Sequence, residues 1–221
     1  MLDSASCHTS ARRGTAVTYT YPPGRTGLLL IDTVNDVFAE DGKGYPLYAA
    51  EFARIGLLGN LTRLLAGLRE KDVAVFFSPM SYTDEEYASW RHPTGLHRAM
   101  FENRLFEAGS WGAEFHPELS PAEGEVTLAP HKNIDVFATT DLDTQLRRRG
   151  VEHLALGGMI GTMCVESTAR SAMERGYHVT MLSDATASDG DAVSHAKMLD
   201  RYALFAHAVL DVDGFLAAAR P

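Results

Sequence analysis

The stretch from Gly157 to Ala187, GGMIGTMCVESTARSAMERGYHVTMLSDATA, constrains the fold more than any other part of the chain. Its order predicts the end of a strand, a glycine-rich turn, a helix that starts at Cys164 and stops at Gly176, and a second strand. Two parallel strands joined through a helix form a right-handed crossover. The free N–H groups of a helix start favour negative charge, so this position lowers the pKa of a thiol and favours its thiolate.

Apolar runs elsewhere predict further strands of the same sheet. Strands are predicted at 27–31, 73–77, 125–128, 153–156, 178–182 and 208–210, and helices at 50–71, 140–150, 163–175, 191–205 and 212–219. The alternation predicts an α/β fold, a three-layer α/β/α sandwich around a mostly parallel six-stranded sheet of order 3-2-1-4-5-6. Residues 1–24 are predicted to form an N-terminal arm, with a frayed terminus as an equally good interpretation, and residues 25–221 to form one domain.

Composition excludes several classes of partner. The net charge of −9 argues against binding to nucleic acid or to an anionic membrane, and no apolar run approaches the length of a membrane span. Two cysteines in 221 residues make no disulfide framework, and the N-terminus lacks the apolar core of a signal peptide. We therefore expect a cytoplasmic protein, where thiols stay reduced.

The predicted topology brings two reactive side chains together. Asp32 ends the first strand and Cys164 follows the fourth, and ligands bind outside the carboxyl ends of parallel strands where the strand order reverses. Each residue alone also has a structural interpretation. Asp32 at a strand end could cap the next helix, and a single buried cysteine is usually an inert part of the core.

Three sequence blocks resemble the signature blocks of the isochorismatase-like cysteine hydrolases. These blocks are LLLIDTVNDVF, HKNIDVFATTDL and the stretch after Gly157, in that order along the chain. The family includes nicotinamidases, N-carbamoylsarcosine amidases and ureidoacrylate-type amidohydrolases. The resemblance implies a catalytic triad of Asp32, Lys132 and Cys164, and a non-proline cis peptide bond between Met159 and Ile160.

The resemblance also implies a role for each group. Asp32 would act as the general base, Lys132 would keep Asp32 ionised, and the Cys164 thiolate would attack a carbonyl carbon. The N–H groups of Ile160 and Cys164 would form the oxyanion hole. The substrate would be a small amide, carbamoyl or ureido compound whose linear C–N bond is cleaved through a thioester.

Substrate contacts are predicted at Asn35, Phe38, Trp111 and Phe137, although a local turn bond for Asn35 and core packing for Phe137 fit equally well. The long aromatic segment 79–124 is expected to shape the pocket.

No cofactor and no catalytic metal are expected. The segment that follows the second strand, SPMSYTDEEYASWRH, lacks the Asp-x-His pattern of nicotinamidases. Two alternatives stay open: a vinyl ether hydrolase of isochorismatase type, and a non-catalytic protein of the same fold that binds small molecules. The resemblance further implies a homodimer or homotetramer.

Overall fold

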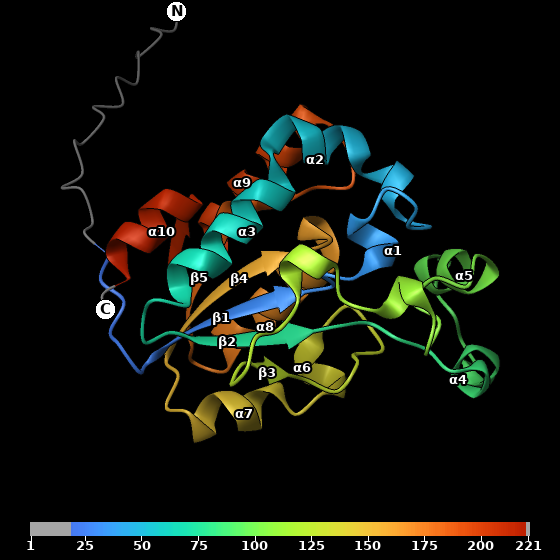
Figure 1. Ribbon diagram of the computed structural model, residues 1–221, viewed down its shortest axis with the longest axis horizontal. Helices are drawn as coiled ribbons and strands as arrows, with labels where there is room; N and C mark the ends of the chain where they lie inside the picture. The colour runs from blue at the N-terminus through green and yellow to red at the C-terminus, as the bar shows by residue number, and fades with distance from the viewer. Residues whose placement is uncertain (1–18, 220–221) are drawn as a thin grey trace, which may run out of the picture.

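Six parallel strands form one sheet at the centre of the molecule (Figure 1). The structure is a computed structural model that describes residues 19–219. The strands are β1 (Thr26–Ile31), β2 (Ala74–Ser78), β3 (Val126–Thr127), β4 (His153–Gly158), β5 (His178–Thr186) and β6 (Ala208–Leu210). Their order is β3-β2-β1-β4-β5-β6, and every neighbouring pair is parallel. This confirms the predicted fold class and strand order.

Helices cover both faces of the sheet. Those after the first two strands are α1 (Asn35–Phe38), α2 (Ala49–Ile55), α3 (Leu57–Leu68), α4 (Asp84–Ser89) and α5 (Gly95–Glu102). The later ones are α6 (Val136–Thr139), α7 (Leu142–Arg148), α8 (Glu166–Glu174), α9 (Ala192–Phe205) and α10 (Val212–Ala218). Helices α3 and α10 pack together on one face, while α6, α7 and α8 lie on the other, and α9 contacts α8 and β6 (Figure 1).

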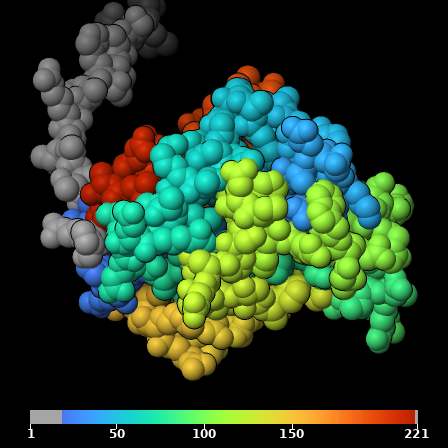
Figure 2. Space-filling model, in the orientation of Figure 1, coloured from blue at the N-terminus to red at the C-terminus, as the bar shows by residue number. Residues whose placement is uncertain are grey.

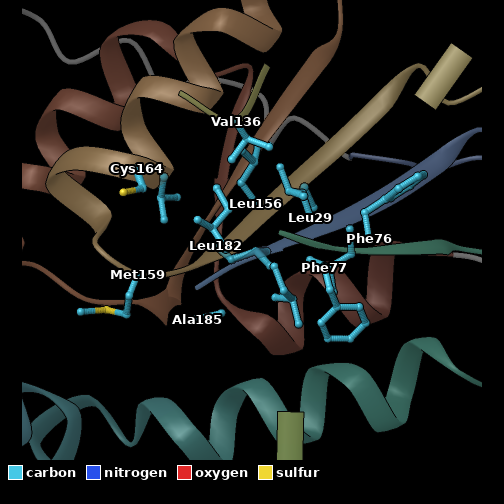
Figure 3. Packing of buried hydrophobic residues seen from close by; sticks show 14 of the residues in the cluster. Leu29, Phe76, Phe77, Val136, Leu156, Met159, Cys164, Leu182 and Ala185 are labelled. Carbon is cyan, nitrogen blue, oxygen red and sulfur yellow. The ribbon is translucent and has the colours of Figure 1, made fainter. Parts of the chain in front are cut away.

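Burial of β1 on both faces makes it the central strand. All six of its residues are buried, as a continuous apolar run without alternation predicts. Figure 3 shows side chains of β1, β2, β4 and β5, among them Leu29, Phe77, Leu156 and Leu182, packed in one cluster. Each fully buried side chain of this kind contributes about 1.5–3 kcal/mol, so the core holds the carboxyl ends of these strands in fixed register.

Two predicted elements differ from the structure. The helix expected at 50–71 is divided into α2 and α3 at Gly56, which adopts a left-handed conformation with φ of 67°. The helix expected at 140–150 spans Leu142–Arg148, and the Thr140 hydroxyl before it accepts a hydrogen bond from the Leu142 N–H.

The segment expected to be irregular, 79–124, contains α4 and α5 and two short 3₁₀ turns, η2 (Trp111–Ala113) and η3 (Pro117–Leu119). Figure 2 shows this segment, in green and yellow-green, against the blue surface that holds α1 and the 3₁₀ turn η1 (Tyr45–Leu47). It therefore lies beside the carboxyl end of β1, where the site is expected.

Most of the predicted N-terminal arm lies outside the described residues. Of the part that is described, Tyr21 is buried, pairs with Ala219 and shares a hydrogen bond of 2.7 Å with Thr180 in β5. Within residues 19–219, the helices are too short or too polar to cross a membrane.

A substitution of Gly158, at the end of β4, tests how closely the backbones of β1 and β4 approach each other. It has φ of 101°, and a Cβ atom on it would lie 2.1 Å from the Ile31 carbonyl oxygen. We expect Gly158→Ala to lower the free energy of unfolding by several kcal/mol, well beyond the ~1–2 kcal/mol cost of the left-handed conformation alone. Denaturant unfolding would measure the loss.

Gly176 supplies the matched control, because it has a similar φ of 87° with open space around it. Gly176→Ala should cost only the conformational penalty. Equal losses in the two variants would show that the backbones of β1 and β4 do not approach each other as closely as described.

Candidate active site

Asp32 and Cys164 meet where the strand order reverses. Ile31 at the end of β1 pairs with Gly158 at the end of β4, and the Met159 N–H donates to the Ile31 carbonyl over 2.9 Å. Asp32 follows with φ of 55°, a left-handed conformation that aspartate tolerates better than most residues. Both Asp32 and Cys164 are buried, and both line one cavity. The predicted juxtaposition is present.

His131 is the direct partner of Asp32. Its Nε2 lies 2.9 Å from Asp32 Oδ1, and its Nδ1 lies 2.7 Å from the carbonyl oxygen of Asn133. The ring is completely buried. Its backbone continues the edge of the sheet, because the His131 N–H donates to the Pro79 carbonyl beyond the end of β2.

These two contacts determine where protons lie. A carbonyl oxygen can only accept, so Nδ1 of His131 carries a proton that it donates to Asn133. The contact between Nε2 and the Asp32 carboxyl group then needs one further proton between them. Burial lowers the pKa of His131, but the charge of Asp32 and the hydrogen bonds to Asp32 and Asn133 outweigh it and raise the pKa above its usual value. We therefore interpret the pair as an imidazolium beside a carboxylate, the charge state that the raised pKa of His131 favours.

Lys132 makes its hydrogen bonds elsewhere, and Asp32 is not among their acceptors. Its Nζ donates to the Ser81 carbonyl over 2.5 Å and to Glu86 Oε2 over 2.8 Å. Successive side chains of an extended backbone point to opposite sides, so a shift of one position exchanges the inward residue for the outward one. Here His131 points inward and Lys132 outward. Sequence reasoning missed His131, since a histidine next to a lysine at a strand end carries no local signal of direction.

Cys164 lies on a π-helical turn, η4 (Gly161–Val165), that leads directly into α8. Figure 3 shows it on this turn, with Met159 at the end of the preceding strand. The peptide bond between Met159 and Ile160 is cis, as the family resemblance implied. The backbone N–H groups of Ile160 and of Cys164 itself both lower the pKa of the Cys164 thiol. These are the two groups that the family resemblance assigns to the oxyanion hole.

The thiol is protonated at rest, contrary to the expectation from the helix start. Burial raises the pKa of Cys164 first of all, and the negative charge of Asp32 and a hydrogen bond to it raise the pKa further. The two N–H groups act in the opposite direction without cancelling these effects. A thiolate therefore forms when the thiol proton passes to a base, and Asp32 is the acidic group whose charge acts on this thiol.

A largely apolar cavity opens in front of this group. Its lining comes from the switch point, from the turns around α1 and η1, and from the segment around α5: Asp32, Val37, Gly44, Tyr48, Met80, Leu96, Met100, Leu105, Phe106, Met159, Ile160 and Cys164. Segment 79–124 therefore helps to form the pocket, as expected.

Asp36 holds two walls of the cavity together. Its buried carboxylate accepts the Phe106 N–H over 2.7 Å and the Lys43 N–H over 3.3 Å. The loop before η1 and the turn after α5 are thus joined through one side chain. Backbone donors satisfy this carboxylate, so its role is to position the walls.

The four predicted substrate contacts lie outside the cavity lining. Asn35 is buried and donates to the Trp111 carbonyl, and the Trp111 side chain is half exposed. Phe38 stacks on Phe52, because it lies about 100° around the α1 turn from Val37, which does line the cavity. Phe137 packs between Tyr177 and Arg175. The structure gives these four residues supporting positions and does not bring them to Cys164.

Metal-ligating side chains do not gather at this site. Among the residues from 19 to 219, no group of three or more His, Cys, Asp or Glu side chains is arranged to hold a metal ion.

Comparison with known proteins gives consistent matches over nearly the whole domain. The isochorismatase domain family matches residues 26–213. Ureidoacrylate amidohydrolase RutB of Klebsiella variicola (strain At-22) is 29% identical over 217 residues, covering 91% of this chain and 90% of that protein.

Solved structures share the fold. An isochorismatase-like hydrolase from Alkaliphilus metalliredigens superposes with a TM-score of 0.73 at 26% identity, covering 89% of this chain and 100% of the other. A cysteine hydrolase from Pseudomonas syringae pv. phaseolicola superposes with a TM-score of 0.77 at 22% identity, covering 91% and 95%.

The raised pKa of His131 predicts a specific dependence of stability on pH. The folded state holds this proton more tightly than the unfolded chain, so the stabilisation is fully present below pH ~6.5 and is lost as pH rises through the raised value. The difference in free energy of unfolding between the wild type and His131→Gln should therefore shrink as pH rises from 6 to 9 in urea titrations.

The exposed His92 provides the control, since His92→Gln should give a small difference that pH does not change in this way. A gap between the wild type and His131→Gln that stayed constant or grew with pH would contradict the ion pair.

Proposed function

We propose, since the chain belongs to the isochorismatase domain family, that it is a cysteine-dependent amidohydrolase. It would cleave the linear C–N bond of a small amide, carbamoyl or ureido compound. One observation supports this most strongly: a buried thiol and a buried carboxyl group, Cys164 and Asp32, line one cavity together with Ile160. The name of the Klebsiella variicola relative points to the same class of reaction.

The first half of the proposed reaction forms a thioester. Asp32 takes the thiol proton, and the Cys164 sulfur attacks the carbonyl carbon to form a C–S bond. The N–H groups of Ile160 and Cys164 stabilise the resulting oxyanion, and one such donor is typically worth ~2.7–4 kcal/mol. Asp32 then gives its proton to the amide nitrogen, the C–N bond breaks, and ammonia or an amine leaves.

The second half hydrolyses the thioester. Asp32 removes a proton from water, the hydroxyl oxygen attacks the acyl carbon, and the C–S bond breaks as the proton returns to sulfur. The acid is released and the thiol is restored. Throughout, imidazolium His131 is the positioning cation that keeps Asp32 ionised between proton transfers. The family resemblance assigns this role to Lys132, and the contacts of His131 support its transfer to the neighbouring residue.

The thioester is tested at Cys164. Wild-type enzyme mixed with a panel of small amides and quenched in acid should show, by intact-mass measurement, an increase equal to the acyl group minus one hydrogen. Cys164→Ala should lack both the adduct and turnover, while Cys7→Ala, the control for the second cysteine of the chain, should keep both.

Two results would contradict the proposal in different ways. Amide hydrolysis that survives in Cys164→Ala would contradict the thioester mechanism, because no sulfur nucleophile would remain at this site. No adduct and no turnover with any amide would favour a non-catalytic binding protein.

The positioning cation is tested by two neighbouring substitutions. His131→Gln leaves the buried Asp32 without its counter-charge, so kcat should fall by roughly 100-fold or more. Lys132→Gln removes a partly exposed ion pair with Glu86 and the bond to the Ser81 carbonyl, neither of which involves Asp32, and kcat should change by less than about threefold. Steady-state ammonia release measures both.

His131→Lys keeps the cation, and because lysine ionises near pH ~10.4, activity should extend to higher pH than in the wild type. A loss in Lys132→Gln as large as that in His131→Gln would return the role to Lys132.

A further inference from the structure

Apolar side chains from α1, from α5 and from the turn after α5 form one wall of the cavity. Val37 comes from α1, Leu96 and Met100 lie one helical turn apart on α5, and Leu105 and Phe106 follow that helix. A wall of this kind gives an acyl chain dispersion contacts and removes its apolar surface from water.

The three methionines of the lining let the cavity adapt its shape to different ligands. Met80, Met100 and Met159 all line the cavity. Methionine side chains are unbranched and polarizable, and they fill irregular gaps around ligands of different shape. The pocket therefore fits apolar acyl groups as a class better than one rigid ring.

Basic side chains next to this wall are engaged elsewhere. Lys43, which precedes the lining residue Gly44, donates its Nζ to the Arg104 carbonyl over 2.6 Å. Arg104, which precedes Leu105, pairs with Asp84 and with Glu107, each over 2.6 Å. In the described part of the chain, no lysine or arginine lines the cavity. A substrate carboxylate would find no fixed counter-charge on this wall.

Two negative charges, those of Asp32 and Asp189, act on the polar part of the lining. Asp32 lies within the lining, and His131 already balances it through the 2.9 Å contact. The charge of Asp189 also reaches Tyr48, the remaining polar side chain of the lining. Burial first, and then the charges of Asp189, Cys164 and Asp32, raise the pKa of Tyr48 to about 12, so its hydroxyl stays neutral. A second negative charge in this cavity would be both unpaired and repelled.

We propose that this pocket selects uncharged amides with an apolar acyl group and rejects acyl groups that carry a carboxylate. This inference rests on the proposed amidohydrolase function. This preference would distinguish the chain from its Klebsiella variicola relative. The name of that relative gives ureidoacrylate, which is a carboxylate. The amide group would face Asp32 and Cys164, and the rest of the acyl chain would extend toward α5.

A matched pair of amides tests the selectivity. 4-Methylpentanamide and succinamate have nearly the same shape, with an isopropyl group in one where the other has a carboxylate. We expect kcat/KM for 4-methylpentanamide to exceed that for succinamate by roughly 100-fold or more, since each factor of ten corresponds to about 1.4 kcal/mol of unpaired-charge cost.

Binding to Cys164→Ala separates the pocket from the chemistry. Calorimetry on this variant should give tighter binding of 4-methylpentanamide than of succinamate. If succinamate is bound and hydrolysed better, the inference is wrong while the proposed function stands. If 4-methylpentanamide binds better but neither compound acylates Cys164 in the wild type, the selectivity holds and the proposed thioester chemistry fails.

A substitution in the cavity lining tests the same selectivity by changing the protein instead of the substrate. Leu96 is half-buried, so Leu96→Arg can place a guanidinium at the wall while its stem follows the apolar surface. It should reduce the preference for the neutral amide by at least tenfold. Leu204→Arg, at a residue 86% exposed on α9, is the control and should leave the ratio unchanged. Equal ratios in the wild type and Leu96→Arg would show that this wall does not select the acyl group.

Discussion

The ion pair between Asp32 and His131 is the interaction on which the site depends. A buried carboxylate without a counter-charge would take up a proton and lose its ability to act as a base. His131 prevents this because its other nitrogen is fixed by the Asn133 carbonyl, which leaves Nε2 directed at Asp32. Unlike a lysine, this cation belongs to a group whose ordinary pKa lies near neutrality, so its charge depends on pH more than that of a lysine would.

The sheet places Asp32 of this pair in the same cavity as the Cys164 thiol, and segment 79–124, which follows β2, forms part of the cavity wall. The register between β1 and β4 brings Asp32 beside Met159, and the turn that follows carries Cys164 and the two N–H donors. Asp36 then joins the loop before η1 to the turn after α5. The reacting groups are thus held by the core, and the shape of the pocket is set by less regular segments. Chemistry and selectivity can vary separately in such an arrangement.

The fold follows from the sequence because long apolar runs and helical periodicity are strong signals. The run before Asp32 identifies the central strand, and the glycine-rich turn identifies the place of Cys164. The third group could not be assigned in the same way. Whether His131 or Lys132 points inward depends on the register of a short edge segment, where a shift of one residue reverses every side chain. Likewise, Phe38 and Val37 are adjacent, and only packing against Phe52 decides which of them faces the cavity.

The protonation state of His131 is the most direct test of its ion pair with Asp32. Nitrogen chemical shifts of its ring, followed by NMR against pH in the wild type and in Asp32→Asn, report both ring protons and the pKa. In the wild type we expect an imidazolium whose pKa lies above the ordinary histidine value. In Asp32→Asn the pKa of His131 should fall below that value, because burial then acts without the carboxylate charge. A His131 that titrates at or below the ordinary value in both proteins would contradict this ion pair.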